Sequence, residues 1–265
     1  MNGPPANSNV LFADADNTLW DTDRVFACAQ LSLLEAVEAA VSRQAHVQDR
    51  LGFVRVLDQM LAERHHAGLR YPPRLLARTI GLVLSGIQPD RAVRLAWAGA
   101  RDQEQLLESQ AESIETSFIS AIGSLPALRP GVAEGLSILH AGGCLVIIVT
   151  EGHREKIAQT ASAHDLNKYI DRIIEAPKHP RLFERIQLLK GLPSRGYMVG
   201  DQLERDIRPA KEAGLTTIYF PGGFKPRWET DPELAQPDYQ ISSFAEIPTI
   251  VLGTVSSTQP RGSRG

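Results

Sequence analysis

The sequence contains few of the features that mark secreted, membrane-spanning or disulfide-stabilised proteins. Only two cysteines occur in 265 residues, Cys28 and Cys144, which is too few for a disulfide framework and favours a reducing compartment. The longest apolar run, residues 144–149, is far shorter than the roughly 18 residues of a membrane-spanning helix. The first residues have neither the basic nor the apolar segment of a secretory signal. We therefore expect a cytoplasmic protein with no membrane partner.

The sequence also has no excess of charge of one sign. The sum of Lys and Arg is 28 and that of Asp and Glu is 31, so the net charge is −3 and no basic stripe favours nucleic acid. Hydrophobic residues make up 43% and charged residues 22%, as in ordinary folded domains. The length suits one large domain or two modest ones, at roughly 150 residues each. A phosphate-bearing ligand would have to be held by local charges.

Two sequence patterns divide the chain. From residue 21 to residue 123, apolar residues recur at helical spacing without a convincing strand, which predicts four to six helices. After Pro126, short apolar segments such as 144–149, 197–199 and 216–220 alternate with helical segments. Together with an apolar strand at 10–13, this alternation predicts an α/β fold with a Rossmann-like parallel sheet and helices on both faces.

The interruption of this pattern predicts the domain organisation. We expect a discontinuous α/β core of residues 8–20 and 125–252, and an all-helical insertion of residues 21–124. Residues 1–7 and 253–265 are expected to be flexible tails, because the last of them are rich in Ser, Gly, Pro and Arg.

Carboxylates and a hydroxyl follow the predicted strands. Asp14 and Asp16 come after the first strand, Thr150 ends a later one, and Asp201 and Asp206 follow another. In open parallel sheets, ligands bind at the carboxyl ends of the strands, so these side chains gather at one edge if the strands are neighbours. Carboxylates placed close together repel each other unless a cation neutralises them, and Mg²⁺ prefers such oxygen ligands. The sequence therefore predicts a Mg²⁺ site.

Four short motifs occur in order along these strand ends. The first is Asp-x-Asp-x-Thr within residues 12–20, and the second is Thr150 after an apolar strand. The third is Lys178 after Ala176-Pro177, and the fourth is Gly-Asp-x-x-x-x-Asp over 200–206. In these motifs, and over about residues 8 to 250, the sequence resembles the haloacid dehalogenase superfamily of phosphohydrolases.

The resemblance implies a reaction through a phosphorylated enzyme. Asp14 would be the nucleophile that forms an aspartyl-phosphate, and Asp16 would protonate the leaving oxygen and then deprotonate water. Mg²⁺ would be held by Asp14, by the backbone carbonyl of Asp16 and by Asp201. The helical insertion would be a cap that closes over the site and selects the substrate.

The resemblance also implies a phosphate site. Thr150, the backbone near Glu151 and the Lys178 ammonium would bind phosphoryl oxygens, although Thr150 could instead cap the next helix and Lys178 could be solvated. Asp206 would support the site by orienting Lys178 or Asp201, by a water-mediated metal contact, or by a role at a helix N-terminus. Glu151 departs from the Thr-Asn-Gly pattern of the family, which leaves the contacts of the leaving group open.

These features predict a Mg²⁺-dependent phosphomonoester hydrolase that acts on a small phosphorylated metabolite. Dehalogenases of the superfamily lack an acid at the position of Asp16, and the phosphonate-cleaving branch needs a cap lysine, whereas residues 21–123 contain no lysine. A phosphomutase and a catalytically silent binding protein with the same fold are the alternatives. We expect no nucleic-acid partner, and a homodimer stays open.

Overall fold

The computed structural model describes residues 9–64, 71–100, 106–190, 196–225 and 235–253. The chain divides into two compact units, one formed by Met1–Asp21 with Pro126–Gly265 and the other by Thr22–Leu125. We call them the core unit and the helical unit. The tails predicted at 1–7 and at 253–265 lie, except for residue 253, outside the described residues.

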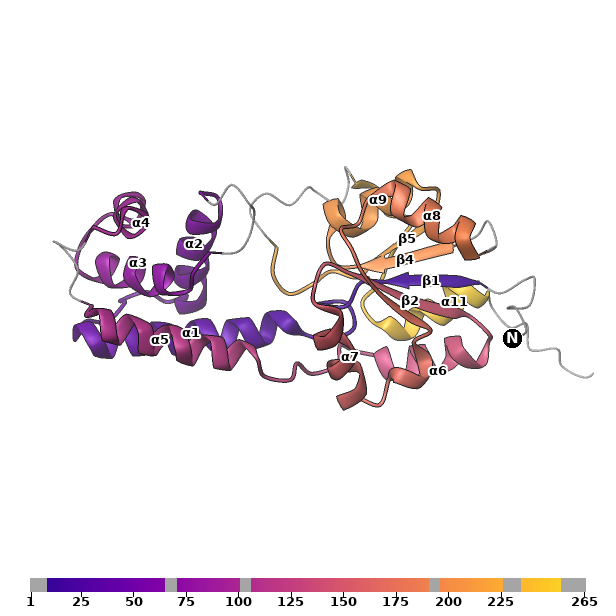
Figure 1. Ribbon diagram of the computed structural model, residues 1–265, viewed down its shortest axis with the longest axis horizontal. Helices are drawn as coiled ribbons and strands as arrows, with labels where there is room; N and C mark the ends of the chain where they lie inside the picture. The colour runs from indigo at the N-terminus through magenta and orange to yellow at the C-terminus, as the bar shows by residue number, and fades with distance from the viewer. Residues whose placement is uncertain (1–8, 65–70, 101–105, 191–195, 226–234, 254–265) are drawn as a thin grey trace, which may run out of the picture. The chain divides into compact units, whose positions relative to one another are not determined.

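A six-stranded parallel sheet forms the centre of the core unit, in the order β3-β2-β1-β4-β5-β6 (Figure 1). The strands are β1 (Val10–Ala13), β2 (Leu145–Thr150), β3 (Arg172–Glu175), β4 (Gly196–Gly200), β5 (Thr216–Tyr219) and β6 (Tyr239–Gln240). Ala13 of β1 lies opposite Ile148 of β2 and Val199 of β4. The three strands whose ends carry the predicted site residues are therefore neighbours.

Helices cover both faces of this sheet. Alternate side chains of β1 enter two separate hydrophobic clusters, with Leu11 and Ala13 on one face and Val10 and Phe12 on the other. The first face is covered by α6 (Val132–Ala141), α7 (Arg154–Ala163) and α11 (Ile247–Leu252). The second is covered by α8 (Pro180–Lys190) and α9 (Arg208–Glu212).

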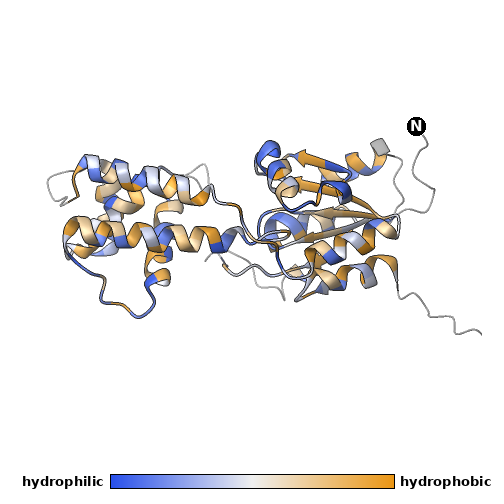
Figure 2. Ribbon diagram, turned by 90° about the horizontal axis from the view of Figure 1, so that it is seen from below, coloured by the Kyte–Doolittle hydropathy of each residue, from blue (hydrophilic) through white to orange (hydrophobic). Residues whose placement is uncertain are grey.

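Burial of the sheet on both faces explains why its strands are continuous apolar runs. Figure 2 shows these strands as mostly hydrophobic, beside helices of mixed hydropathy. Short helical turns, η1 (Asn167–Tyr169) and η3 (Phe244–Glu246), complete the connections that surround the sheet. The predicted α/β fold with a parallel, Rossmann-like sheet is confirmed.

The described part of the helical unit contains five helices, α1 (Thr22–Val41), α2 (Arg50–Ala62), α3 (Arg74–Leu84), α4 (Pro89–Ala98) and α5 (Glu108–Ile122). The helices α1 and α5 lie side by side (Figure 1). Every one of the five contributes buried apolar side chains to a common core, among them Leu34, Leu57, Ile80, Val93 and Ile114. The unit thus has a hydrophobic core of its own. Among the described helices, none combines the length and the apolar character that crossing a bilayer requires.

Candidate active site

The loop after β1 places Asp14 at the centre of the sheet edge. The Asp14 N–H donates to the carbonyl of Val199 at 2.9 Å, which continues the pairing of β1 with β4 by one residue. The chain then turns, and Asn17 adopts a left-handed backbone conformation with φ of 58°, which asparagine tolerates better than most residues. This turn brings the hydroxyl of Thr18 to 3.3 Å from Asp14 Oδ2, where it donates a hydrogen bond. Asp14 and Thr18 are both buried.

Lys178 reaches the same point from the segment after β3. Its Nζ donates a short hydrogen bond to Asp14 Oδ1 and lies 2.7 Å from Asp206 Oδ1, while its side chain is only 5% exposed. Burial by itself would lower the pKa of Lys178, but the carboxylates of Asp14 and Asp206 raise it above its ordinary value. The ammonium therefore stays charged and is fixed between two carboxylates.

Three buried carboxylates meet beside this lysine. Asp14, Asp201 and Asp206 each offer one oxygen, and these atoms lie within 4.8 Å of one another. Burial raises the pKa of Asp14 to about 7, with contributions from Asp206 and Asp16 against the opposing effect of Lys178. Burial also raises the pKa of Asp201 well above its ordinary value. The ammonium of Lys178 carries one positive charge, which does not balance three carboxylates.

The cluster has the chemistry of a site for a hard divalent cation. Asp201 Oδ1 is buried and makes no hydrogen bond within the described part of the chain, although a buried carboxylate oxygen normally has a partner. Carboxylate oxygens are the ligands that Mg²⁺ prefers. The residues present therefore fit a magnesium ion.

A π-helical turn explains how Asp206 returns to the strand end. The segment η2 (Leu203–Ile207) is π-helical, and the N–H groups of Asp206 and Ile207 both donate to the carbonyl of Gln202, at 2.9 and 3.3 Å. The N–H of Gln202 in turn donates to Asp206 Oδ2 at 2.9 Å. A Cβ on Gly200 would lie only 2.3 Å from that of Asp206, so the glycine leaves room for the aspartate. The helical segment expected between the strands at 197–199 and 216–220 therefore begins with a π turn before α9.

Thr150 and Asp16 face a common glycine. The Gly152 N–H donates to Thr150 Oγ1 at 3.0 Å, and a Cβ on Gly152 would lie 3.5 Å from Asp16 Oδ2. Thr150 is buried and uses its hydroxyl in this turn, while α7 begins after His153 and its first N–H, that of Arg154, donates to Glu175 Oε2 at 2.8 Å. The alternative that Thr150 caps the next helix is therefore not what the structure contains.

Glu151 lies outside the buried carboxylate cluster. Its side chain is 39% exposed, and Oε2 is 3.2 Å from the guanidinium of Arg205. A carboxylate in this position repels phosphate, so only the backbone N–H of Glu151 is suited to the phosphate-binding role expected from the sequence.

Comparison with known proteins fits this arrangement of motifs. A model of the haloacid dehalogenase-like hydrolase family matches residues 9–214. The chain belongs to this family. The resemblance drawn from its motifs is thereby confirmed, and the buried carboxylates lie at the sheet edge where the motifs placed them.

Two curated relatives of the chain are phosphatases. It is similar to the phosphoserine phosphatase of Thermus thermophilus, with 29% identity over 167 residues, or 62% of this chain and 59% of the relative. It is similar to a phosphoglycolate phosphatase of Pseudomonas fluorescens, with 26% identity over 159 residues, or 55% and 58%. The chain thus matches about three fifths of the length of these relatives.

Solved structures share the fold. The crystal structure of the HAD-hydrolase YfnB from Bacillus subtilis, bound to magnesium, has a TM-score of 0.58 and 18% identity, and the match covers 92% of this chain and 98% of that one.

A contact between Trp20 and Asp16 in this haloacid dehalogenase-like site was not predicted from the sequence. The indole N–H of Trp20 donates to Asp16 Oδ1 at 3.1 Å, and Trp20 is fully buried. A hydrophobic residue after the first motif is expected in the core, and the spacing of four residues between aspartate and indole was the available signal. Trp20 thus both fills the core and holds one oxygen of Asp16.

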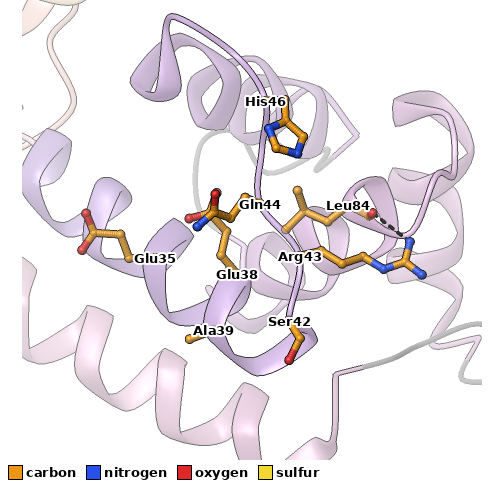
Figure 3. Close-up of a pocket in the computed structure, with 8 residues that line it drawn as sticks. All are labelled: Glu35, Glu38, Ala39, Ser42, Arg43, Gln44, His46 and Leu84. Carbon is orange, nitrogen blue, oxygen red and sulfur yellow. Dashed lines mark hydrogen bonds between the residues drawn. The ribbon is translucent and has the colours of Figure 1, made fainter.

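The helical unit has a separate hollow of about 840 Å³, shown in Figure 3. It is lined by Glu35, Glu38, Ala39, Ser42, Arg43, Gln44, His46 and Leu84. Arg50 binds both carboxylate oxygens of Glu38, at 3.0 and 2.8 Å, and Arg43 donates to the carbonyl of Leu84 at 3.2 Å. The Glu38 carboxylate and the Arg43 guanidinium at this hollow thus have partners inside the helical unit.

Proposed function

We propose that this protein is a Mg²⁺-dependent phosphomonoester hydrolase that acts on a small phosphorylated metabolite through an aspartyl-phosphate. The observation that carries the proposal is the buried Asp14 carboxylate, hydrogen-bonded by Lys178 and Thr18 and grouped with Asp201 and Asp206. The phosphatase activities of the two curated relatives support the same reaction class.

In the first step, a carboxylate oxygen of Asp14 attacks phosphorus. The new bond joins Asp14 to the phosphoryl group as the bond from phosphorus to the ester oxygen breaks, and Asp16 gives its proton to that oxygen. In the second step, Asp16 takes a proton from water, whose oxygen attacks phosphorus. The bond to Asp14 then breaks, which releases phosphate and restores both carboxyl groups.

The surrounding residues support this chemistry. Thr18 and Lys178 orient the two oxygens of Asp14. Lys178 adds positive charge close to the transferring group. The Thr150 hydroxyl, whose oxygen accepts from the Gly152 N–H, keeps its own O–H for a phosphoryl oxygen, and the backbone N–H of Glu151 is a second donor. The indole of Trp20 fixes the side chain that moves the proton.

Asp14, Asp201 and the backbone carbonyl of Asp16 would hold the magnesium ion, with Asp206 as a supporting residue. When bound, it lowers the repulsion between the anionic nucleophile and the anionic ester. Two observations support this assignment: the buried Asp201 oxygen has no hydrogen-bond partner among the described residues, and the similar structure from Bacillus subtilis was solved bound to magnesium. We further propose that the helical unit, residues 22–125, is a cap that selects the substrate, as the position of the insertion between the first and second motifs indicates.

The test is phosphate release by the purified full chain from a panel of phosphorylated metabolites that includes phosphoserine and phosphoglycolate, with Mg²⁺ or with a chelator. We expect release that requires Mg²⁺ and that falls by about 10³-fold or more in Asp14→Asn. The matched control is Asp90→Asn, the same change at an exposed position of α4.

No Mg²⁺-dependent release from any substrate, or equal activity of Asp14→Asn and the control, contradicts the proposal. Transfer of labelled phosphate between two hydroxyls without net release would instead identify a mutase.

A further inference from the structure

Arg129 joins two loops at the edge of the candidate site. It precedes α6, and its guanidinium donates to three backbone carbonyls, those of Asn17, of Phe220 at 3.1 Å and of Pro221 at 2.7 Å. The guanidinium also stacks over the ring of Phe220, at 3.5 Å from its centre. One side chain thus connects the loop after β1 with the loop after β5.

Both loops border the proposed metal ligands. Asn17 directly follows Asp16, and its left-handed backbone, with φ of 58°, sets the direction of the chain as it leaves the first motif. Gly222 follows the carbonyls bound by Arg129, and a Cβ there would lie 3.1 Å from Asp201 Oδ2 and 3.6 Å from Asn17 Cβ. The Phe220–Gly222 backbone is therefore packed against Asp201 and against the loop that carries Asp16.

We propose that Arg129 is a positioning residue for the divalent cation. It holds the Asn17 backbone, next to Asp16, at a fixed distance from the Phe220–Gly222 backbone, which packs against Asp201. It thereby fixes the Asp16 carbonyl relative to the Asp201 carboxylate. This inference rests on the proposed function, because that function assigns the Asp16 carbonyl and the Asp201 carboxylate to the metal. Arg129 itself touches neither the metal nor the substrate in this assignment.

Arginine suits this role better than any other side chain. Its planar guanidinium presents five N–H donors in a rigid fork and stacks on aromatic rings, whereas a lysine ammonium is a single, strongly hydrated point charge. The three carbonyls and the Phe220 ring use both properties. A lysine at position 129 would keep the positive charge but lose the planar set of N–H donors. The Arg129→Lys variant therefore distinguishes the effect of the charge from the effect of the hydrogen-bond geometry.

The experiment is calorimetric titration of the full chain with Mg²⁺ in the absence of substrate, for wild type, Arg129→Lys, Arg129→Gln and Asp201→Asn. Substitutions of residues that orient metal ligands typically weaken metal binding by about 10–100-fold. We expect that range for both Arg129 variants, and no measurable binding for Asp201→Asn. Arg208→Lys is the matched control, because Arg208 lies on the same unit and makes exposed ion pairs with Glu204 and Glu212.

The thermal midpoint of each variant, measured without metal, separates positioning from general stabilisation. A lower midpoint with a Mg²⁺ dissociation constant within twofold of wild type for both Arg129 variants overturns the inference and leaves the proposed function intact. Absence of Mg²⁺ binding by the wild type, or unchanged binding by Asp201→Asn, instead overturns the metal assignment of the proposed function. Arg129→Lys keeps the test valid if Arg129→Gln does not fold.

Discussion

Replacement of Lys178 with methionine would remove a buried charge while keeping most of the side-chain volume. Lys178 Nζ lies 2.7 Å from Asp206 Oδ1 and also binds Asp14. At that distance, an effective dielectric constant of about 20 gives an attraction of about 6 kcal/mol per ion pair, which the desolvation of the ions largely offsets. The variant keeps the buried carboxylates and loses the attraction, so we expect the free energy of unfolding of the core unit to fall by ~3–5 kcal/mol.

Scanning calorimetry of the full chain in a chelator measures this loss. At ~2–4 °C per kcal/mol, the midpoint of the core unit should fall by about 6–20 °C. Mg²⁺ should return part of the loss, because a ligand that binds only the folded state stabilises it and here also supplies positive charge to the cluster. Addition of Asp206→Asn to the variant should also return part of it, since one buried charge is then gone.

Lys211→Met is the control for the same change at the surface. The Lys211 side chain is 40% exposed and its Nζ lies 3.7 Å from Asp238 Oδ1, so we expect a loss below ~1 kcal/mol. If the midpoint of Lys178→Met falls no further than that of this control, or if Mg²⁺ and Asp206→Asn leave it unchanged, the electrostatic account of the cluster is refuted.

Three further predictions concern substitutions of single residues. Trp20→Phe removes the 3.1 Å hydrogen bond to Asp16, which contributes ~1.5–3 kcal/mol. We expect kcat to fall by about 10–100-fold with little change in KM. An unchanged kcat contradicts the role of the indole. The hydrogen bonds from Arg50 hold the pKa of Glu38 below its ordinary 4.5, so Glu38→Gln should cost ~1–2 kcal/mol at pH 7 in chemical denaturation. That difference should disappear as the pH falls below 4.5, through the folded-state pKa, and a difference that persists in acid rules out this cause. Phe183→Ala, at a fully buried ring on the second face of the sheet, should cost ~3–5 kcal/mol, and a cost below 1 kcal/mol is incompatible with the packing described.

Local patterns in the sequence located the four central strands β1, β2, β4 and β5, but not the edge strand β6, whose two residues are exposed. The apolar runs at β1, β2 and β4 exceed what a solvent-exposed strand would carry, and burial on both faces of a parallel sheet is the physical reason. Such patterns did not locate every helix end, because the chain after β4 contains a π turn that no hydrophobic period reveals. The π turn nevertheless determines the direction in which Asp206 points.

The candidate site shows the same division. The motif spacing predicted Asp14, Asp16, Asp201 and Asp206 as site residues, because each lies next to a strand end or within a motif. The exposed pairing of Glu151 with Arg205 was not predictable, because it depends on the packing of two loops 54 positions apart.

The sequence by itself determined the alternation of the central strands with helices, the interruption by a helical segment, and the protein family. These features are local, since they depend on hydrophobic period, on residues adjacent to strand ends and on short spacings. Only the tertiary structure decided which distant side chains meet. Lys178 binds Asp14 across 164 positions and Arg129 binds Asn17 across 112, and no short-range pattern encodes either contact. The buried carboxylate cluster on which the proposed function rests therefore exists only once the parallel strands are paired.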